Sequence, residues 1–240
     1  MNMALSASAL QPRSLRDRIE RAGALILDVD GTLAETEGIH RRAFNAAFLE
    51  CGVDWYWDRR TYKKLLSVTG GKERLRAYAR MQPLRQRLSD LQLLELHEAK
   101  TRHYARLIAE HTCRLRPGVA AFIRSAIARH QILAIATTTT PSNVEGLLAS
   151  ALGRDWRSLF ATVVAGDEVA HKKPAPDVYL EVLARLRRPA DTCLAIEDSA
   201  NGLKAAASAG IPVLITRSEF FRDDDFSSAL AVVDELTELV

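Results

Sequence analysis

One apolar run with an abrupt polar end constrains the fold of this chain more than any other feature. Residues Ala24 to Leu27 are all apolar, and Asp28-Val29-Asp30-Gly31-Thr32 follow directly. This pattern is typical of a strand that is buried on both faces and presents polar residues at its carboxyl end. Similar apolar runs recur at residues 132–136, 162–165, 194–196 and 213–215. Because helix-like segments separate the runs, they predict an α/β fold with a doubly wound parallel sheet, whose site lies at the carboxyl ends of the strands.

The strand pattern is interrupted between Thr36 and about residue 113, where helical periodicity dominates. The clearest helical segments are HRRAFNAAFLECG and LSDLQLLELHEAKTRHYARLIAEH. We therefore expect a core domain formed by residues 1–34 and 115–240, with a helical lobe of residues 35–114 inserted after the first strand. Within the core domain, residues 1–22 are expected to form a tail or a short leading helix.

Composition excludes several classes of protein. The chain has 240 residues, of which 48% are hydrophobic and 26% charged, as in ordinary folded globular proteins. The net charge of +3 is small and the arginine pairs are scattered, so we expect no nucleic-acid partner. No stretch approaches the roughly 20 apolar residues that a membrane span requires, and the start lacks an apolar signal core. We expect a cytoplasmic protein without a membrane partner.

Two carboxylates stand at the end of the first strand. Asp28 can act as a nucleophile, Asp30 can transfer protons, and the following glycine permits a tight turn. A strand end closed by turn-forming residues is the alternative interpretation.

Three later strand ends or loops carry further candidates. Thr137 follows a core strand, so its hydroxyl and the next backbone N–H groups could bind phosphoryl oxygens, although a threonine row also occurs in polar loops. One lysine of the pair Lys172-Lys173 could balance the charge of a carboxylate and a phosphoryl group, the other being a solvated residue. Glu197 and Asp198 could bind Mg²⁺, or Asp198 could cap the next helix.

The ordered set DVDGT, the threonine row, KPAPD and IEDSANGLKAA resembles the haloacid-dehalogenase (HAD) superfamily. The resemblance implies a Rossmann-like core, the choice of Lys173 over Lys172, and phosphoryl transfer to Asp28 with Asp30 as acid and base. It also implies that Mg²⁺ is the cofactor. Its predicted ligands are Asp28, the backbone carbonyl of Asp30 and Asp198, with Glu197 as an occasional ligand or a supporting residue.

The inserted lobe resembles the type-one cap of the CbbY branch of this superfamily. The matching stretches are LAETEGIHRRAFN, residues 52–58, residues 69–74 and residues 97–101. Members of that branch remove one phosphate from xylulose 1,5-bisphosphate, an inhibitor of Rubisco, and leave xylulose 5-phosphate. The resemblance thus implies a sugar-phosphate substrate. The residues predicted to bind it are Glu37, His40, Gly70, Gly71, Lys72, Glu73, Arg74, His97, Lys100, Thr138 and Asn143.

Other interpretations stay open at this point. Most of the predicted cap contacts are residue types that usually serve as solvated surface or packing groups. The chain could also be a phosphoglycolate phosphatase, a β-phosphoglucomutase-like phosphomutase, or a binding protein of the same fold without turnover, although the last usually lacks Asp28 or Asp30. We expect a monomer.

Overall fold

A six-stranded parallel sheet forms the centre of the computed structural model, which describes residues 12–84, 87–110 and 114–240. The strand order is β3-β2-β1-β4-β5-β6, so β1 lies between β2 and β4. The predicted α/β fold is confirmed. The strands are β1 (Ala24–Leu27), β2 (Ile132–Ala136), β3 (Thr162–Val164), β4 (Cys193–Glu197), β5 (Val213–Thr216) and β6 (Ala231–Val233). Strand β6 was not predicted from the sequence, although it lies within the apolar run of residues 229–233.

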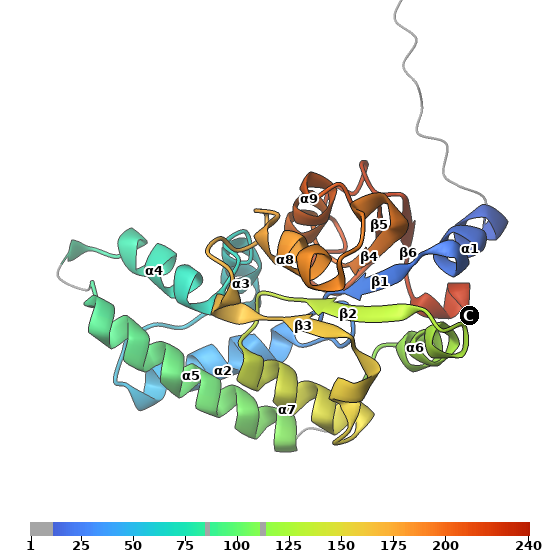
Figure 1. Ribbon diagram of the computed structural model, residues 1–240. Coiled ribbons are helices and arrows are strands. Elements are labelled where there is room, and N and C mark those ends of the chain that lie inside the picture. Colours follow the sequence, from blue (N-terminus) through green and yellow to red (C-terminus); the bar gives the residue numbers. More distant parts are fainter. Residues whose placement is uncertain (1–11, 85–86, 111–113) are drawn as a thin grey trace, which may run out of the picture.

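Both faces of the sheet are covered by helices, as continuous apolar strands require (Figure 1). Leu25 and Leu27 point into a hydrophobic cluster with three helices on one face, α1 (Pro12–Arg21), α6 (Val119–Ala128) and α7 (Pro141–Leu152). Ala24 and Ile26 point into a second cluster with α8 (Asp177–Leu186) and α9 (Ala200–Ser208) on the other face. The two-residue period of a strand thus divides β1 between two cores.

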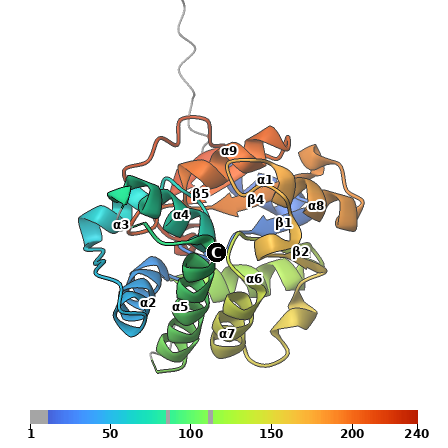
Figure 2. The same ribbon diagram turned by 90° about the vertical axis from the view of Figure 1, so that its left-hand side faces the viewer.

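Four helices gather at one end of the sheet, away from the C-terminus, and Figure 2 looks onto them. They are α2 (Glu37–Glu50), α3 (Arg59–Leu65), α4 (Gly71–Met81) and α5 (Asp90–Glu110). Their shared core is rich in aromatic side chains, with Phe44, Trp57 and Tyr62 buried in one cluster. The helices α2 and α5 also contribute Ile39 and Tyr104 to the core beneath the sheet, so apolar packing is continuous along both helices. We keep the domain division at residues 34 and 115 as a prediction.

A buried arginine joins the two segments that connect these helices to the sheet. Arg116 stands on the outgoing segment, and its backbone N–H donates to the carbonyl of Leu33 on the incoming segment over 2.8 Å. Its guanidinium donates to the carbonyls of Gly31, Arg217 (2.6 Å) and Asp234 (2.9 Å). A planar group with five donors can satisfy several carbonyls at once, so Arg116 fixes both connections and the loop after β1.

Across the described ranges, helices with enough length and apolar character to cross a bilayer are absent.

Candidate active site

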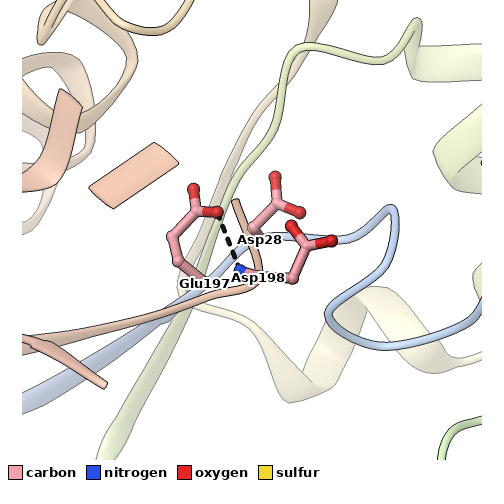
Figure 3. A group of neighbouring side chains, drawn as sticks. All are labelled: Asp28, Glu197 and Asp198. Carbon is pink, nitrogen blue, oxygen red and sulfur yellow. Dashed lines mark hydrogen bonds between the residues drawn. The ribbon is translucent and has the colours of Figure 1, made fainter. Parts of the chain in front are cut away.

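The candidate site lies at the carboxyl ends of β2, β1 and β4. Because β1 pairs in register with both neighbours, the residues that follow these three strands meet at one edge of the sheet. Asp28 follows β1 directly, while Glu197 ends β4 and Asp198 comes next. Figure 3 shows their carboxyl groups gathered together, and one carboxylate oxygen from each lies within 4.8 Å of the others.

Lys173 binds this carboxylate group from the loop that precedes α8. Its ammonium donates to Asp28 Oδ1 over 2.6 Å, to Glu197 Oε1 over 2.5 Å and to the carbonyl of Ala136 over 2.9 Å. An ammonium has three N–H donors, so all of them are used. Lys173 therefore links the ends of all three strands and fixes the orientation of Asp28.

Lys172 has a different environment from the one predicted for it. Its side chain is mostly buried rather than solvated, and its ammonium contacts Asp167 Oδ1 over 2.9 Å and the carbonyl of Gly166. The two lysines thus point to different partners, and only Lys173 contacts Asp28.

Burial and the crowding of carboxyl groups shift the pKa values at the site. Burial raises the pKa of Asp28 to about 8, against the opposing charge of Lys173. Burial and the neighbouring charges of Asp28 and Glu197 raise the pKa of Asp198 well above its usual value. Burial would lower the pKa of Lys173, but the same two carboxylates outweigh it and raise that pKa. Three carboxyl groups face one lysine, so the site can accommodate further positive charge.

The donor set fits a magnesium ion. Asp198 Oδ2 is buried and has no hydrogen-bond partner among the described residues, which suits a ligand atom. A Cβ at Gly31, where φ is +81°, would lie 1.9 Å from this oxygen, so only glycine allows the approach. Glu197 differs, because Oε1 accepts from Lys173 and Tyr179 and Oε2 accepts from the backbone of Asp198. Asp28 and Asp198 are therefore better placed to hold the ion than Glu197.

Asp30 belongs to a separate hydrogen-bond network that leads toward the helices. Its Oδ1 accepts from Thr36 Oγ1 over 2.6 Å and lies 3.2 Å from His40 Nε2. Lys100 lies 2.8 Å from His40 Nδ1 and can only donate, so His40 is neutral and carries its proton on Nε2. Burial alone would raise the pKa of Asp30, but His40, Thr36 and Lys100 together lower it to about 2. In this form Asp30 is ionised and can accept a proton.

The threonines after β2 close one side of the cavity. Thr137 is buried, its N–H donates to the carbonyl of Val164, and its hydroxyl accepts from the N–H of Thr139. Thr138 also lines the cavity. Asn143 lies behind them on α7 and donates to the hydroxyl of Thr139 over 3.1 Å, so it reaches the cavity only through that threonine.

Six of the predicted substrate-binding residues of the helical lobe line the same cavity. Glu37 accepts a hydrogen bond from Tyr62 over 2.5 Å, and Arg74 donates to the same phenol over 3.0 Å. Burial lowers the pKa of Lys100 to about 8. The six residues are Glu37, His40, Gly70, Gly71, Arg74 and Lys100.

Three other predicted contacts surround the cavity without lining it. Lys72 donates to Asp167, which lies just after β3, over 2.6 Å. The carboxylate of Glu73 lies where a Cβ on Gly70 would point. His97 packs against Gly71, and burial together with the charge of Lys100 lowers its pKa to about 4.

Several lining residues escaped the sequence analysis. Thr36 was missed as well, and it contacts Asp30 without lining the cavity; a threonine before a helix is a typical capping residue, but here its hydroxyl donates to Asp30 instead. Asn201 on α9 donates to Thr69 over 3.0 Å and thereby joins the two sides of the cavity. No local pattern announces a contact across 132 positions of the chain. The missed lining residues are Phe44, Leu66, Thr69, Thr139, Ser199, Asn201 and Phe221.

Comparison with known proteins shows what this chain is similar to. The family model for haloacid dehalogenase-like hydrolases matches residues 22–210. The plasmid-borne CbbY of Cupriavidus necator is 52% identical over 216 residues, which cover 89% of this chain and 85% of that protein. CbbY of Rhodobacter capsulatus is 50% identical over 206 residues, covering 86% and 90%. A crystal structure of a CbbY mutant from Rhodobacter sphaeroides with xylulose 1,5-bisphosphate is 43% identical, covers 91% of this chain and 96% of its own, and has a TM-score of 0.87.

Proposed function

Since the chain belongs to the haloacid dehalogenase-like hydrolases and to their CbbY branch, and is a phosphatase, we propose that it is a Mg²⁺-dependent enzyme that converts xylulose 1,5-bisphosphate to xylulose 5-phosphate and phosphate. The observation that carries the proposal is one cavity with two charged ends. Asp28, Asp198 and Lys173 line it at the sheet, and Arg74 and Lys100 line it at the helices.

The proposed reaction begins at Asp28, which Lys173 orients. A carboxylate oxygen of Asp28 forms a bond to phosphorus while the bond from phosphorus to the sugar oxygen breaks, giving an aspartyl-phosphate. Asp30 supplies the proton to the leaving oxygen, so it must be protonated in the substrate complex. A water molecule then attacks phosphorus, Asp30 accepts its proton, and Asp28 and phosphate are released. The hydrogen bonds from Thr36 and His40 hold Asp30 in place for both transfers.

We assign the magnesium ion to Asp28 and Asp198, with the backbone carbonyl of Asp30 as a further proposed ligand. When bound, the ion would offset the repulsion between a carboxylate nucleophile and an anionic phosphate. Glu197 keeps Lys173 in position instead of binding the ion.

The residues of the helical lobe supply the proposed contacts to the sugar and to its second phosphate. Glu37 is fixed by Tyr62 and can accept hydrogen bonds from sugar hydroxyls. Lys100 and Arg74 provide positive charge, and Gly70 and Gly71 allow the backbone to approach a phosphate closely. For Lys72, Glu73, His97 and Asn143 the proposal is an indirect role, through the shape of the surrounding loops. The monomeric state and the cytoplasmic location stay predictions.

The proposal is tested by phosphate release, with Mg²⁺ and at matched concentrations, from xylulose 1,5-bisphosphate, ribulose 1,5-bisphosphate, phosphoglycolate and β-glucose 1-phosphate. We expect a strong preference for the first and xylulose 5-phosphate as its product. Preference for phosphoglycolate, or isomerisation of the glucose phosphate without release, would overturn the substrate while keeping the reaction at Asp28.

A further inference from the structure

A tyrosine that the proposed mechanism does not use lies beneath the catalytic lysine. Tyr179 stands in the first turn of α8, six residues after Lys173, and its side chain is fully buried. Its hydroxyl donates to Glu197 Oε1 over 2.6 Å. The ammonium of Lys173 lies 5.2 Å from the centre of its ring. One short segment thus supplies two groups that meet at the same carboxylate.

The carboxylate of Glu197 is held on every side. Oε1 receives Lys173 and Tyr179, and Oε2 receives the backbone N–H of Asp198. Behind it lies the backbone of α9, since a Cβ on Gly202 would fall 2.0 Å from Glu197 Oε2. Glu197 therefore cannot turn away, and its negative charge must be balanced where it lies.

Lys173 is shared between Glu197 and Asp28, and its third donor is used by the carbonyl of Ala136. Any change in the strength of the ion pair between Lys173 and Glu197 therefore changes how strongly Lys173 binds Asp28. The hydrogen bond that Tyr179 donates disperses part of the negative charge of Glu197 and so weakens the attraction between Glu197 and Lys173.

We propose that Tyr179 is a positioning residue, whose hydroxyl competes with Lys173 for Glu197 and so keeps the ammonium directed at Asp28. The role rests on the proposed function. It is distinct from packing, because phenylalanine would fill the same space and remove only the hydroxyl.

The experiment compares Tyr179→Phe with Tyr78→Phe, a control in the aromatic cluster of the helical lobe. Both are assayed with xylulose 1,5-bisphosphate and with para-nitrophenyl phosphate, a small ester that tests the core chemistry without the sugar contacts. We expect Tyr179→Phe to lower kcat about tenfold with both esters, as for a lost hydrogen bond to a charged group, and to leave KM unchanged. Tyr78→Phe should keep both constants.

A purely structural role is separated by repeating the substitution in a Glu197→Gln background. There the charge that Tyr179 disperses is gone, so removal of the hydroxyl should change kcat less than about twofold. A full tenfold loss in that background, or a normal kcat for Tyr179→Phe alone, would overturn the positioning role and leave the proposed function standing. A folded wild type that hydrolyses neither ester would overturn the proposed function, and the positioning role with it.

Discussion

The two sides of the cavity hold their charged groups in different ways. On the sheet side, Lys173 contacts both Asp28 and Glu197 directly, and each of the three comes from a different segment of the chain. On the helical side, Arg74 donates to Tyr62 and to two backbone carbonyls, and Lys72 donates to Asp167.

This difference separates chemistry from recognition. The charged groups on the sheet side are linked through Lys173, which donates to both Asp28 and Glu197, so a change in any one alters the others. The charged groups on the helical side already donate hydrogen bonds to other protein groups. A ligand therefore gains only the hydrogen bonds that these groups can still donate. We therefore expect kcat to be sensitive to conservative single substitutions on the sheet side, and KM to tolerate conservative single substitutions on the helical side.

The largest effect should come from Asp28→Asn. The amide keeps the size of the side chain but is a poor nucleophile, so Mg²⁺-dependent phosphate release should fall by at least about a thousandfold. Circular dichroism should show an unchanged fold, because the substitution relieves crowding among buried carboxyl groups. The exposed Asp155→Asn is the matched control. Turnover like that of the wild type would exclude the covalent mechanism.

Magnesium should stabilise the sheet side and not only activate it. A cation that balances three buried carboxyl groups at about one hundred times its Kd should raise the Tm by about 5 to 10 °C. Asp198→Asn should remove most of this shift, and a chelator should remove both the shift and the activity of the wild type. If calorimetry shows an equal increase in Tm with Mg²⁺ for Asp198→Asn, then residues other than Asp198 bind the ion.

Two glycines test how tightly the sheet side is packed. Ala at Gly202 would put a Cβ 2.0 Å from the Glu197 carboxylate, and the displacement should lower kcat by about 10- to 100-fold. Gly146, also inside a helix, has nothing within 4 Å of its Cβ position. Gly146→Ala should keep full activity and add up to about 1 kcal/mol of stability. Equal kinetics for the two variants would show that Glu197 can move without loss.

The pH dependence of binding should reveal Lys100 on the helical side. Its pKa is lowered to about 8, so its ammonium is charged below pH 8 and loses its charge as the pH rises through that value. KM for the bisphosphate should therefore rise above pH 8. In Lys100→Met, KM should be high at every pH, while the exposed Lys64→Met should follow the wild type. If KM of the wild type does not change with pH, then the charge of Lys100 does not contribute to substrate binding.

The smallest effect should come from Lys72. Its ion pair with Asp167 is partly exposed, and such pairs contribute little, so Lys72→Met and Asp167→Asn should each change KM less than about threefold. If Lys72 instead binds the second phosphate, only Lys72→Met should raise KM strongly. Steady-state kinetics of the two variants side by side decides between these roles.

The sequence predicts the sheet side better than the helical side for a physical reason. Strand ends bring Asp28, Thr137 and Asp198 together whenever the strands are neighbours, so short motifs at those ends suffice. The partners of Lys72 and Asn201 depend on how helices pack across the cavity, which no local pattern encodes. Tyr179 was missed although it follows KPAPD, because one buried aromatic residue in an amphipathic helix is typical of packing alone.

The contacts of Arg116 have a consequence for how the molecule can vary. Its guanidinium binds backbone carbonyls of Gly31, Thr216, Arg217 and Asp234, and every residue type carries a carbonyl. The junction therefore depends most on Arg116 and on Gly31, where only glycine fits, and less on the side chains of Thr216 and Arg217. A helical insert of another length or composition could be joined at the same junction, provided that the arginine stays, so substrate choice can diverge while the phosphate chemistry below is preserved.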